Sequence, residues 1–365
     1  MKTEIITLLR QRGTYVSGQE LCEKFGVSRT AVWKAVEQLK KDGYVIEAVK
    51  NRGYLLKEDA ARVFGRTEIE SRLHTEWAGK TLYYFESTDS TNIRAKQLAE
   101  EGAPHGTLVT ADCQTAGRGR RGRSWNSPAG ANLYFTILLR PDILPDKASV
   151  LTLVMALAVA QGIINTVNER EANPVEKSGN TGEKENADGG KNGKHSYCGA
   201  IAQEHCGVGI KWPNDIVADG RKVCGILTEM SLSVEQASIQ YLVVGVGINV
   251  GKQSFPEELA GHAVSLEEIY GPVSRSRLLS EIMKAFEAAY GKFAETENLE
   301  LLKEQYGELL LNVNRKVRVL DPKGEFEGIA RGIRDTGELM VELPDGSITD
   351  VYAGEVSVRG VYGYV

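Results

Sequence analysis

Apolar positions in the first 60 residues recur at helical spacing and then at strand spacing. The pattern predicts a first helix around Ile5, Leu8 and Leu9, then helices over 18–25 and 29–42, and strands over 44–49 and 53–56. Ser17 and Ser28 precede the second and third helices as N-caps, and Gly43 ends the third. Because helix, helix, recognition helix and wing follow in this order, we expect a winged helix-turn-helix domain over residues 1–62.

The third helix and the wing would present polar and basic side chains to DNA. Val32, Val36 and Leu39 fall on the inward face of that helix, which leaves its polar residues outward. The residues expected at DNA are Ser28, Arg29, Thr30, Lys34, Lys50 and Arg52. Residues 1–60 hold 11 Lys and Arg against 8 Asp and Glu, whereas the remainder holds 33 against 41. This asymmetry suits a DNA-contacting module, although a small helical interaction domain without a DNA role could carry the same charge.

From residue 66 the pattern becomes mixed α/β, and we expect one such domain over 66–312. Strands are predicted over 81–85, 107–111, 133–139, 208–211, 223–228 and 241–248. Helices are predicted over 92–101, 149–167, 274–295 and 299–310. The fold class is therefore α+β with several domains.

Two further segments differ from this pattern. Residues 313–365 alternate short β runs with turns at 321–324 and 344–346, which predicts a small β barrel. Between Arg170 and Lys194 the chain is rich in Gly, Asn, Glu and Lys, with Val175 as its only large aliphatic residue. Such a segment cannot offset its ordering entropy by burial, so we expect a disordered insertion over 170–197.

Composition, cysteines and apolar runs limit the classes of protein. The composition is that of a soluble globular protein, and no signal peptide precedes the first helix. The most apolar run, 150–167, is interrupted by polar residues, so we interpret it as a buried helix and not as a membrane span. Five scattered cysteines favour a reducing, cytoplasmic compartment over a disulfide framework. Cys198, His205 and Cys206 lack a fourth ligand at zinc spacing, so we interpret these cysteines as incidental.

One short loop concentrates arginine and glycine: Gly117-Arg118-Gly119-Arg120-Arg121-Gly122-Arg123-Ser124-Trp125. Glycines let a backbone approach a ligand closely, and guanidinium groups match the oxygens of phosphates and carboxylates. The spacing is neither that of a Walker A loop nor that of a Rossmann fingerprint. On its own it fits a solvated basic loop or a nucleic-acid-binding segment equally well.

A second motif favours a phosphate-handling site. Val208-Gly209-Ile210-Lys211-Trp212-Pro213-Asn214-Asp215 runs an apolar strand into a lysine and a turn, so Lys211 would stand at the strand's end, where a solvent-exposed lysine is the alternative. Three more segments accompany it: Ser90-Thr91-Asn92, Lys222-Val223-Cys224-Gly225-Ile226-Leu227-Thr228-Glu229 and Gly245-Val246-Gly247-Ile248-Asn249. Taken singly, the first is a helix-cap signal and the last is a strand-to-loop turn.

In order and identity these segments, with Gln114, resemble those of the biotin protein ligases over nearly the whole chain. The first 60 residues resemble the DNA-binding domain of the bifunctional members, which combine ligation with repression of biotin genes. The resemblance implies a catalytic domain like that of class II synthetases and an SH3-like C-terminal barrel. It also implies a carbon–nitrogen bond-forming ligase that uses ATP to couple biotin to a lysine of a biotin carboxyl carrier protein. At 170–197 the chain departs from the family, which crosses this point with a short link.

The resemblance also assigns site residues by position. For biotin it implies Ser90, Thr91, Asn92, Gln114, Gly117, Arg118, Gly119, Arg120, Lys211 and Gly245. For ATP it implies Arg120, Arg121, Gly122, Arg123, Trp125, Asn214, Lys222, Gly247 and Asn249, with Trp125 near the adenine. Ser, Thr and Gln side chains agree with this assignment, because the ureido ring of biotin needs both hydrogen-bond donors and acceptors.

The chemistry needs no nucleophilic side chain. A carboxylate is a poor electrophile until ATP converts it into an acyl-adenylate, so catalysis can consist of positioning and charge stabilisation. Lys211 and Arg120 are the expected catalytic residues, with Lys211 at the carboxylate and α-phosphate oxygens. Mg²⁺ is implied by the triphosphate, and we expect no metal site built by the protein. The expected partners are the carrier protein, operator DNA and a second copy of the chain in a ligand-bound homodimer, and we expect no membrane partner.

Three functions remain open at this point. The first is a biotin ligase that also represses transcription. A lipoate-type ligase shares the reaction class, but its motifs do not resemble the Gly-Arg loop or the Lys-Trp-Pro-Asn-Asp turn. A transcription factor with a ligand-sensing domain would keep the winged helix and would not need Lys211.

Overall fold

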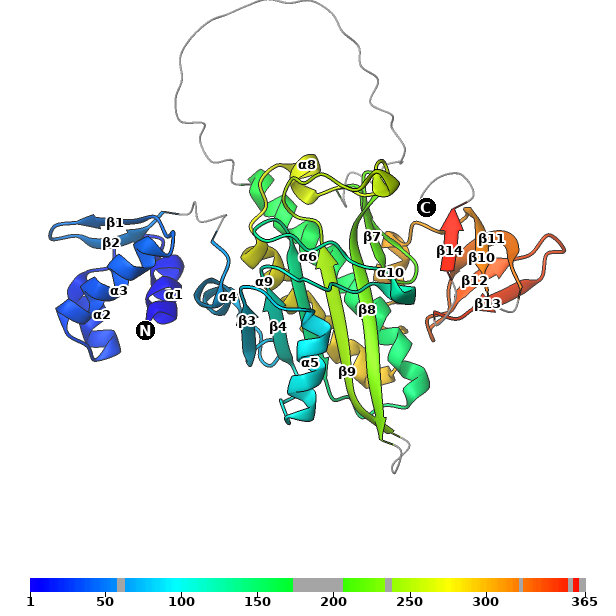
Figure 1. The fold of residues 1–365 in the computed structure, drawn as a ribbon, viewed down its shortest axis with the longest axis horizontal. Helices are drawn as coiled ribbons and strands as arrows, with labels where there is room; N and C mark the ends of the chain where they lie inside the picture. Colours follow the sequence, from blue (N-terminus) through cyan, green and yellow to red (C-terminus); the bar gives the residue numbers. More distant parts are fainter. Residues whose placement is uncertain (58–62, 173–205, 234–237, 322–323, 354–356, 361–365) are drawn as a thin grey trace, which may run out of the picture.

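The structure is a computed structural model that describes residues 1–57, 63–172, 206–233, 238–321, 324–353 and 357–360. Three sheets organise these residues, and the units that carry them follow one another along the longest axis of the molecule (Figure 1). The N-terminal unit has a two-stranded sheet, the central unit a seven-stranded sheet and the C-terminal unit a five-stranded sheet. This arrangement confirms the predicted α+β fold class.

The N-terminal unit has the order of elements that its caps predict. Its elements are α1 (Lys2–Arg12), α2 (Gly18–Phe25), α3 (Arg29–Lys41), β1 (Ile46–Val49) and β2 (Gly53–Leu56). Ser17 accepts a hydrogen bond from the backbone N–H of Glu20, and Ser28 accepts one from Ala31, so both serines cap their helices. The apolar faces of the helices and the wing enclose a small core that is separate from the rest of the protein.

The central sheet has its seven strands in the order β3-β4-β5-β9-β8-β7-β6. The bounds are β3 (Leu82–Phe85), β4 (Thr107–Ala111), β5 (Leu133–Leu139), β6 (Val208–Lys211), β7 (Asp215–Ala218), β8 (Arg221–Ser233) and β9 (Ser238–Ile248). Neighbouring strands are antiparallel except for β3 and β4. Strand β7 is absent from the predicted set, because it begins within the expected turn and is too short to show a hydrophobic period.

Helices cover both faces of the central sheet (Figure 1). The alanines of α5 (Thr91–Glu100) pack on one face, against β4, β5 and β9. On the other face, α6 (Val150–Ala172) and α9 (Arg275–Thr296) lie side by side. Gly162 permits this approach, since a Cβ there would stand 2.9 Å from the backbone nitrogen of Ile282.

Helix α6 is long and apolar enough to cross a membrane, yet it belongs to the protein core. Within residues 145–168, 89% of its 18-residue apolar window is buried inside the protein. This burial agrees with the interpretation of 150–167 as a core helix. The helix also continues to Ala172, so 170–172 are helical and the predicted start of the insertion is wrong there. The rest of the predicted insertion, with Cys198 and His205, lies outside the described residues.

Short helical segments complete the described chain. They are α4 (Arg66–Arg72), η1 (Arg120–Gly122), η2 (Pro145–Ser149), η3 (Glu257–Leu259), α8 (Leu266–Tyr270) and α10 (Lys303–Leu309). The sequence pattern predicts α10 over too long a range and does not predict α4 or α8. Segments of five to seven residues are too short to show helical periodicity.

The C-terminal sheet is antiparallel and has the strand order β13-β12-β11-β10-β14. Its strands are β10 (Lys316–Leu320), β11 (Phe326–Ile333), β12 (Leu339–Glu342), β13 (Ile348–Val351) and β14 (Ser357–Gly360). The predicted turn at 344–346 joins β12 to β13, whereas 322–323 lie outside the described residues. Apolar residues of this sheet and of the central unit form one continuous core. At their junction the buried Trp212 indole N–H donates to the Gly337 carbonyl over 3.0 Å.

Candidate ligand-binding site

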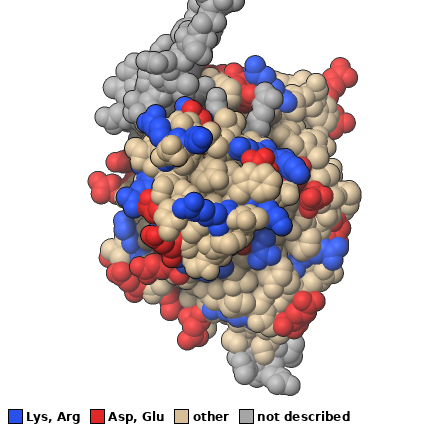
Figure 2. All heavy atoms as spheres, turned by 90° about the vertical axis from the view of Figure 1, so that its left-hand side faces the viewer, with Lys and Arg blue, Asp and Glu red and all other residues tan. Residues whose placement is uncertain are grey.

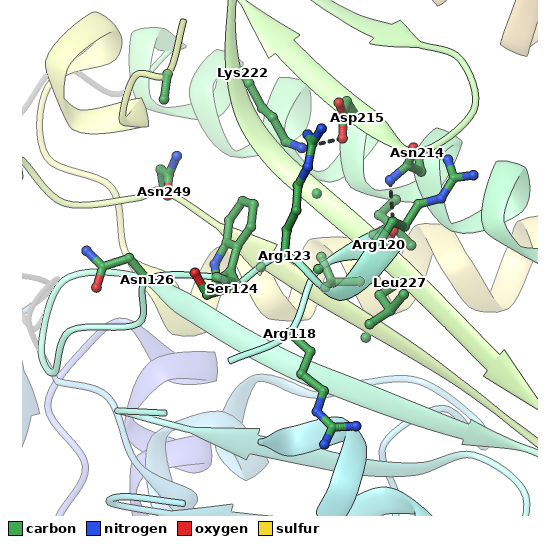
Figure 3. A pocket seen from close by; sticks show the side chains of 18 of the residues that line it. Arg118, Arg120, Arg123, Ser124, Asn126, Asn214, Asp215, Lys222, Leu227 and Asn249 are labelled. Atoms are coloured by element: carbon green, nitrogen blue, oxygen red, sulfur yellow. Dashed lines mark hydrogen bonds and ion pairs between the residues drawn. The ribbon is translucent and has the colours of Figure 1, made fainter. Parts of the chain in front are cut away.

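A pocket of about 290 Å³ opens beside the central sheet, bounded by residues 117–125, here called the arginine loop, and by the segment 251–263 (Figure 3). Fifteen of the predicted site residues line it: Ser90, Thr91, Asn92, Gln114, Arg118, Gly119, Arg120, Arg121, Arg123, Trp125, Asn214, Lys222, Gly245, Gly247 and Asn249. Gly117, Gly122 and Lys211 do not line it. The fold therefore brings together segments that are up to about 160 residues apart in the chain.

The start of α5 forms one end of the pocket. Ser90 is the N-cap residue of α5, as the cap signal predicts, although its hydroxyl makes no cap hydrogen bond to the helix. Thr91 donates to the Gln114 Oε1 from its backbone N–H over 2.9 Å and from its hydroxyl over 3.2 Å. The Gln114 Nε2 donates to the Ser127 hydroxyl over 2.9 Å. The Gln114 amide is thus held in one orientation at the wall of the pocket.

Asn92 is clamped by neighbours on two strands. Its Oδ1 accepts from the Thr136 hydroxyl over 2.7 Å, and its Nδ2 donates to Glu229 over 2.8 Å. Glu229 also accepts from the Lys96 ammonium over 2.6 Å. Burial opposes the charged form of Glu229, but hydrogen bonds from Lys96 and Asn92 hold its pKa below the usual value. Asn92 therefore serves mainly to fix the first turn of α5 against β5 and β8.

Glycines on two adjacent strands make a flat floor beneath Trp125. Gly225 on β8 pairs with Gly247 on β9. A Cβ on Gly247 would stand 2.5 Å from the Trp125 Nε1, and one on Gly225 would stand 3.0 Å from the indole ring. The Lys222 ammonium lies 5.5 Å from the centre of that ring. The Trp125 Nε1 is buried without a hydrogen-bond partner among the described residues, which leaves one donor for a ligand.

The arginine loop folds back on itself as a small hairpin. The Trp125 N–H donates to the Gly117 carbonyl over 2.9 Å, and the Gly119 N–H donates to Arg123 over 2.8 Å. At its tip Gly122 has φ of 71°, in the left-handed region that favours glycine. A Cβ on Gly117 would overlap the Trp125 carbonyl oxygen. These contacts explain why Gly117 and Gly122 shape the loop without lining the pocket.

The arginines of the loop point in different directions (Figure 3). Arg120 donates to the Asn214 Oδ1 over 2.8 Å and to the Ala353 carbonyl of the C-terminal unit over 3.0 Å. Burial lowers the pKa of the Arg120 guanidinium, and the nearby Asp215 carboxylate opposes this effect. Figure 3 shows Arg118 directed away from Arg120 and Arg123. The loop therefore contacts both the sheet and the C-terminal unit.

Lys211 ends β6, as predicted, and is paired in register with Asp215 across the β6–β7 hairpin. Only 7% of it is exposed, so the alternative of a solvent-exposed strand-end lysine is wrong. Asn214 and Asp215, which follow it closely, do line the pocket. Asp215 forms an ion pair of 2.5 Å with Lys222. Lys211 thus lies next to the polar end of the pocket without forming part of its surface.

The segment 251–263 forms a wall of the pocket that no sequence motif marks. It contributes Gln253, Phe255, Pro256, Leu259, His262 and Ala263. The Gln253 Nε2 donates to the Asn249 Oδ1 over 3.2 Å, so this segment is tied to the end of β9. The apolar Phe255-Pro256 pair in a polar stretch is the only signal that could have drawn attention to it.

The exposed face of the N-terminal unit carries the residues predicted at DNA. Ser28, Arg29, Thr30, Lys34, Lys50 and Arg52 are all exposed. Figure 2 shows Lys and Arg side chains across the middle of this view, with Asp and Glu along its edges. Arg52 stacks on the Tyr15 ring, with 4.4 Å between the guanidinium carbon and the ring centre. Trp33, which sequence analysis overlooked, is 55% exposed on α3 beside Lys34.

Family models cover the three units of the chain. The Biotin/lipoate A/B protein ligase family matches residues 84–249, an HTH domain matches 2–55, and the biotin protein ligase C terminal domain matches 313–359. Among solved structures, the biotin protein ligase from Aquifex aeolicus in complex with biotin and ATP is 27% identical, with a TM-score of 0.56. The alignment covers 77% of this chain and 99% of that one.

Full-length relatives extend this likeness to the whole chain. The bifunctional ligase/repressor BirA of Bacillus subtilis is 36% identical over 364 residues, which cover 98% of each protein. The protein of the same name from Escherichia coli is 29% identical and covers 98% of this chain and 96% of its own length. The chain therefore belongs to the biotin protein ligase family and, within it, to the bifunctional ligase/repressors.

Proposed function

We propose that this chain is an ATP-dependent biotin protein ligase that also represses transcription. The observation that carries the proposal is the pocket, in which the arginine loop, the start of α5 and the glycines of β8 and β9 come together. Its ligase activity would form biotinyl-5′-AMP and then transfer biotin to a lysine of a biotin carboxyl carrier protein. We place the protein in the cytoplasm, where carrier protein and operator DNA would both be accessible.

Biotin would bind at the end of the pocket that is formed by the first residues of α5. Ser90, Thr91 and Gln114 offer hydroxyl and amide groups there, which suits a ureido ring that both donates and accepts. Arg118 and Gly119 line the same pocket from the arginine loop. The hydrogen bonds that hold the Asn92 side chain, called here the Asn92 clamp, support this placement. Binding groups need a rigid support if they are to hold a substrate in one orientation.

ATP would bind at the end formed by Trp125, Lys222 and the arginine loop. The glycines at 225 and 247 leave space for the Trp125 ring, near which the adenine would lie, and the unpaired Trp125 Nε1 would supply a donor. Arg121, Arg123 and Lys222 carry charge suited to phosphate oxygens, with Asn214 and Asn249 at the margins. The described residues contain no group of three His, Cys, Asp or Glu arranged for a metal ion. We propose that Mg²⁺ binds together with the triphosphate and neutralises part of its charge.

The reaction follows from this placement. A carboxylate oxygen of biotin attacks the α-phosphorus of ATP, the bond to the β-phosphate bridging oxygen breaks, and pyrophosphate leaves. Arg120 and Lys211 would stabilise charge on the oxygens around the α-phosphorus. In the second step the carrier lysine amine attacks the acyl carbon, loses a proton, and AMP leaves. Lys211 is covered in this structure, so its role rests on its position beside Asn214 and Asp215.

Exchange of labelled pyrophosphate into ATP tests the ligase proposal. Biotin, lipoate or no acid is supplied in parallel reactions with the full chain. Exchange that depends on biotin supports the proposal, and exchange that depends on lipoate points to the lipoate-type alternative. A chain that exchanges with neither acid and still binds operator DNA would be a ligand-sensing transcription factor.

Repression would use a dimer that presents two copies of α3 to a palindromic operator. One winged helix of modest charge should bind DNA weakly, whereas two linked copies gain affinity through effective concentration. Arg29, Lys34, Lys50 and Arg52 are the cations we place at DNA. Sedimentation with and without biotin plus ATP, paired with operator binding, tests this arrangement. Equal dimer populations and equal operator affinities in both states would contradict it.

Arg120→Gly is expected to retain part of the adenylate synthesis but to release the intermediate. The change removes the contacts to Asn214 and Ala353 that hold the loop against the sheet and the C-terminal unit. Free biotinyl-5′-AMP then labels exposed lysines of any protein in solution, which mass spectrometry of a bystander such as serum albumin detects. Arg334→Gly is the matched control, because Arg334 is exposed and its side chain donates to Asp350 within the C-terminal unit. Labelling confined to the carrier protein would argue against this role.

A further inference from the structure

A fully buried carboxylate joins the N-terminal unit to the central unit. Glu68, on α4, is 0% exposed and accepts from the Arg10 guanidinium of α1 over 2.9 Å and from Arg72 over 2.5 Å. Arg10 also donates to the Ser71 hydroxyl over 2.6 Å. From α9, the Ser276 hydroxyl donates to Glu68 over 3.3 Å. We call these five residues the Glu68 cluster.

The charge of this cluster is held in place by groups from both units. Burial disfavours the ionised carboxylate, but Arg72 and Arg10 more than offset that effect and keep the pKa of Glu68 below its usual value. The Tyr44 hydroxyl of the N-terminal unit also faces the cluster, and its pKa is raised by burial and by the nearby Glu68. A buried ion pair is costly when one partner moves away. The N-terminal unit therefore cannot rotate on the central unit without breaking the pair.

The start of α9 connects this cluster to the ligand pocket. Arg275, the neighbour of Ser276, donates to Asp112 over 2.6 Å and to the Asn132 carbonyl over 3.1 Å. The Asn132 side-chain amide donates to Gln253 over 3.0 Å. Gln253 lines the pocket and bonds to Asn249. Two sets of hydrogen bonds, joined by the backbone between Arg275 and Ser276, thus connect the nucleotide end of the pocket to α1.

The same helix start also touches the linker between the units. The Arg275 guanidinium carbon lies 4.2 Å from the centre of the Phe64 ring, just after the segment that leaves the wing. Ser280, one turn further along α9, donates to the Arg72 carbonyl over 2.6 Å. A small shift of the α9 start would therefore change the surroundings of α4 and of the linker together.

We propose that Glu68 is a positioning residue that fixes the DNA-binding unit on the catalytic unit, and that the start of α9 transmits the state of the pocket to it. The inference rests on the proposed function and concerns its regulation. If this inference is right, the effect of biotin plus ATP on operator affinity depends on the Glu68 cluster. Adenylate synthesis in the pocket does not depend on that cluster.

Glu68→Gln tests the proposal, because it removes the charge and keeps the shape of the side chain. Operator affinity is measured on the full chain with and without biotin plus ATP, and the ratio of the two is the ligand response. We expect Glu68→Gln to lower this ratio by about threefold or more, in the range of typical coupling energies. Pyrophosphate exchange with biotin should stay within about twofold of the unchanged chain.

Glu70→Gln is the matched control on the same helix. Glu70 also accepts from α1, from the Thr3 hydroxyl over 3.1 Å, but it is partly exposed and lies outside the cluster. Arg10→Met serves if Glu68→Gln does not fold, since it leaves Glu68 paired with Arg72. Ser276→Ala tests the link through α9 and should lower the ligand response in the same direction.

The outcomes separate a positioning role from a structural one. A lower melting temperature with an unchanged ligand response in Glu68→Gln and Arg10→Met would overturn the proposal. So would an unchanged chain that exchanges pyrophosphate but binds operator equally well with and without ligand. If the unchanged chain shows no biotin-dependent pyrophosphate exchange, the proposed ligase function is wrong instead. The exchange is measured on the same protein preparations as operator binding.

Discussion

Replacement of Lys211 by methionine is expected to slow biotin-dependent pyrophosphate exchange by about 10²–10³-fold, the loss typical of removing one preorganised charge-stabilising group. That loss corresponds to roughly 3–4 kcal/mol of transition-state stabilisation. Methionine keeps the length of the side chain and removes the ammonium, so the effect reports the charge. The adjacent Asp215 keeps its ion pair with Lys222, which limits the damage to folding.

Lys252→Met is the control for this substitution. Lys252 is exposed and lies on the segment 251–263, close in sequence to the pocket but outside its lining. It should exchange pyrophosphate at the rate of the unchanged chain. If Lys211→Met kept near-normal exchange with an unchanged melting temperature, Lys211 would be a structural lysine and the assignment of charge stabilisation would fall to Arg120 alone.

Replacement of Gly245 by alanine is expected to disable the biotin end of the pocket. The new Cβ would overlap the Asn92 Oδ1, and that oxygen cannot retreat because Thr136 and Glu229 hold the Asn92 amide. Overpacking of this kind costs about 1–3 kcal/mol, and here the strain falls on the first turn of α5. We expect the apparent KM for biotin to rise by about tenfold or more, with a smaller change in the KM for ATP.

Gly291→Ala makes the same chemical change in open space. Gly291 lies within α9, and a Cβ there would meet nothing within 4 Å. Alanine in a helix interior should stabilise the chain by about 0.5–1 kcal/mol and leave both KM values unchanged. A Gly245→Ala chain with normal biotin KM would show that α5 can move, and the Asn92 clamp would not be the support we describe.

Local physical signals made much of the fold predictable from the sequence. Ser17 and Ser28 cap their helices as expected, since a cap depends only on residues within one turn. Strand β5 has the predicted bounds, because every one of its residues is buried and Thr136 is the single polar residue in the apolar run. Where the signal was short, as in β7 and α4, the prediction failed, since packing against distant segments decides such elements.

Those residues of the site that belong to recognisable sequence motifs could be predicted. The motifs placed most of the pocket residues, but not the wall at 251–263, because that wall has no distinctive spacing. They also did not separate residues that face a ligand from those that shape the backbone, such as Gly117 and Gly122. The burial of Glu68 could not be predicted from the sequence, because its partners Arg10 and Ser276 are distant in the chain.

The continuity of the core has a consequence for how the chain is made. The core of the N-terminal unit is complete at Leu56, whereas the core of the central unit includes residues up to Val358. A ribosome synthesises the chain from its N-terminus, and units fold as soon as their residues have emerged. The winged helix can thus fold early in translation, but the core shared by the central and C-terminal units is complete only once β14 has been synthesised. A nascent chain would therefore complete its winged helix well before the core that supports the pocket.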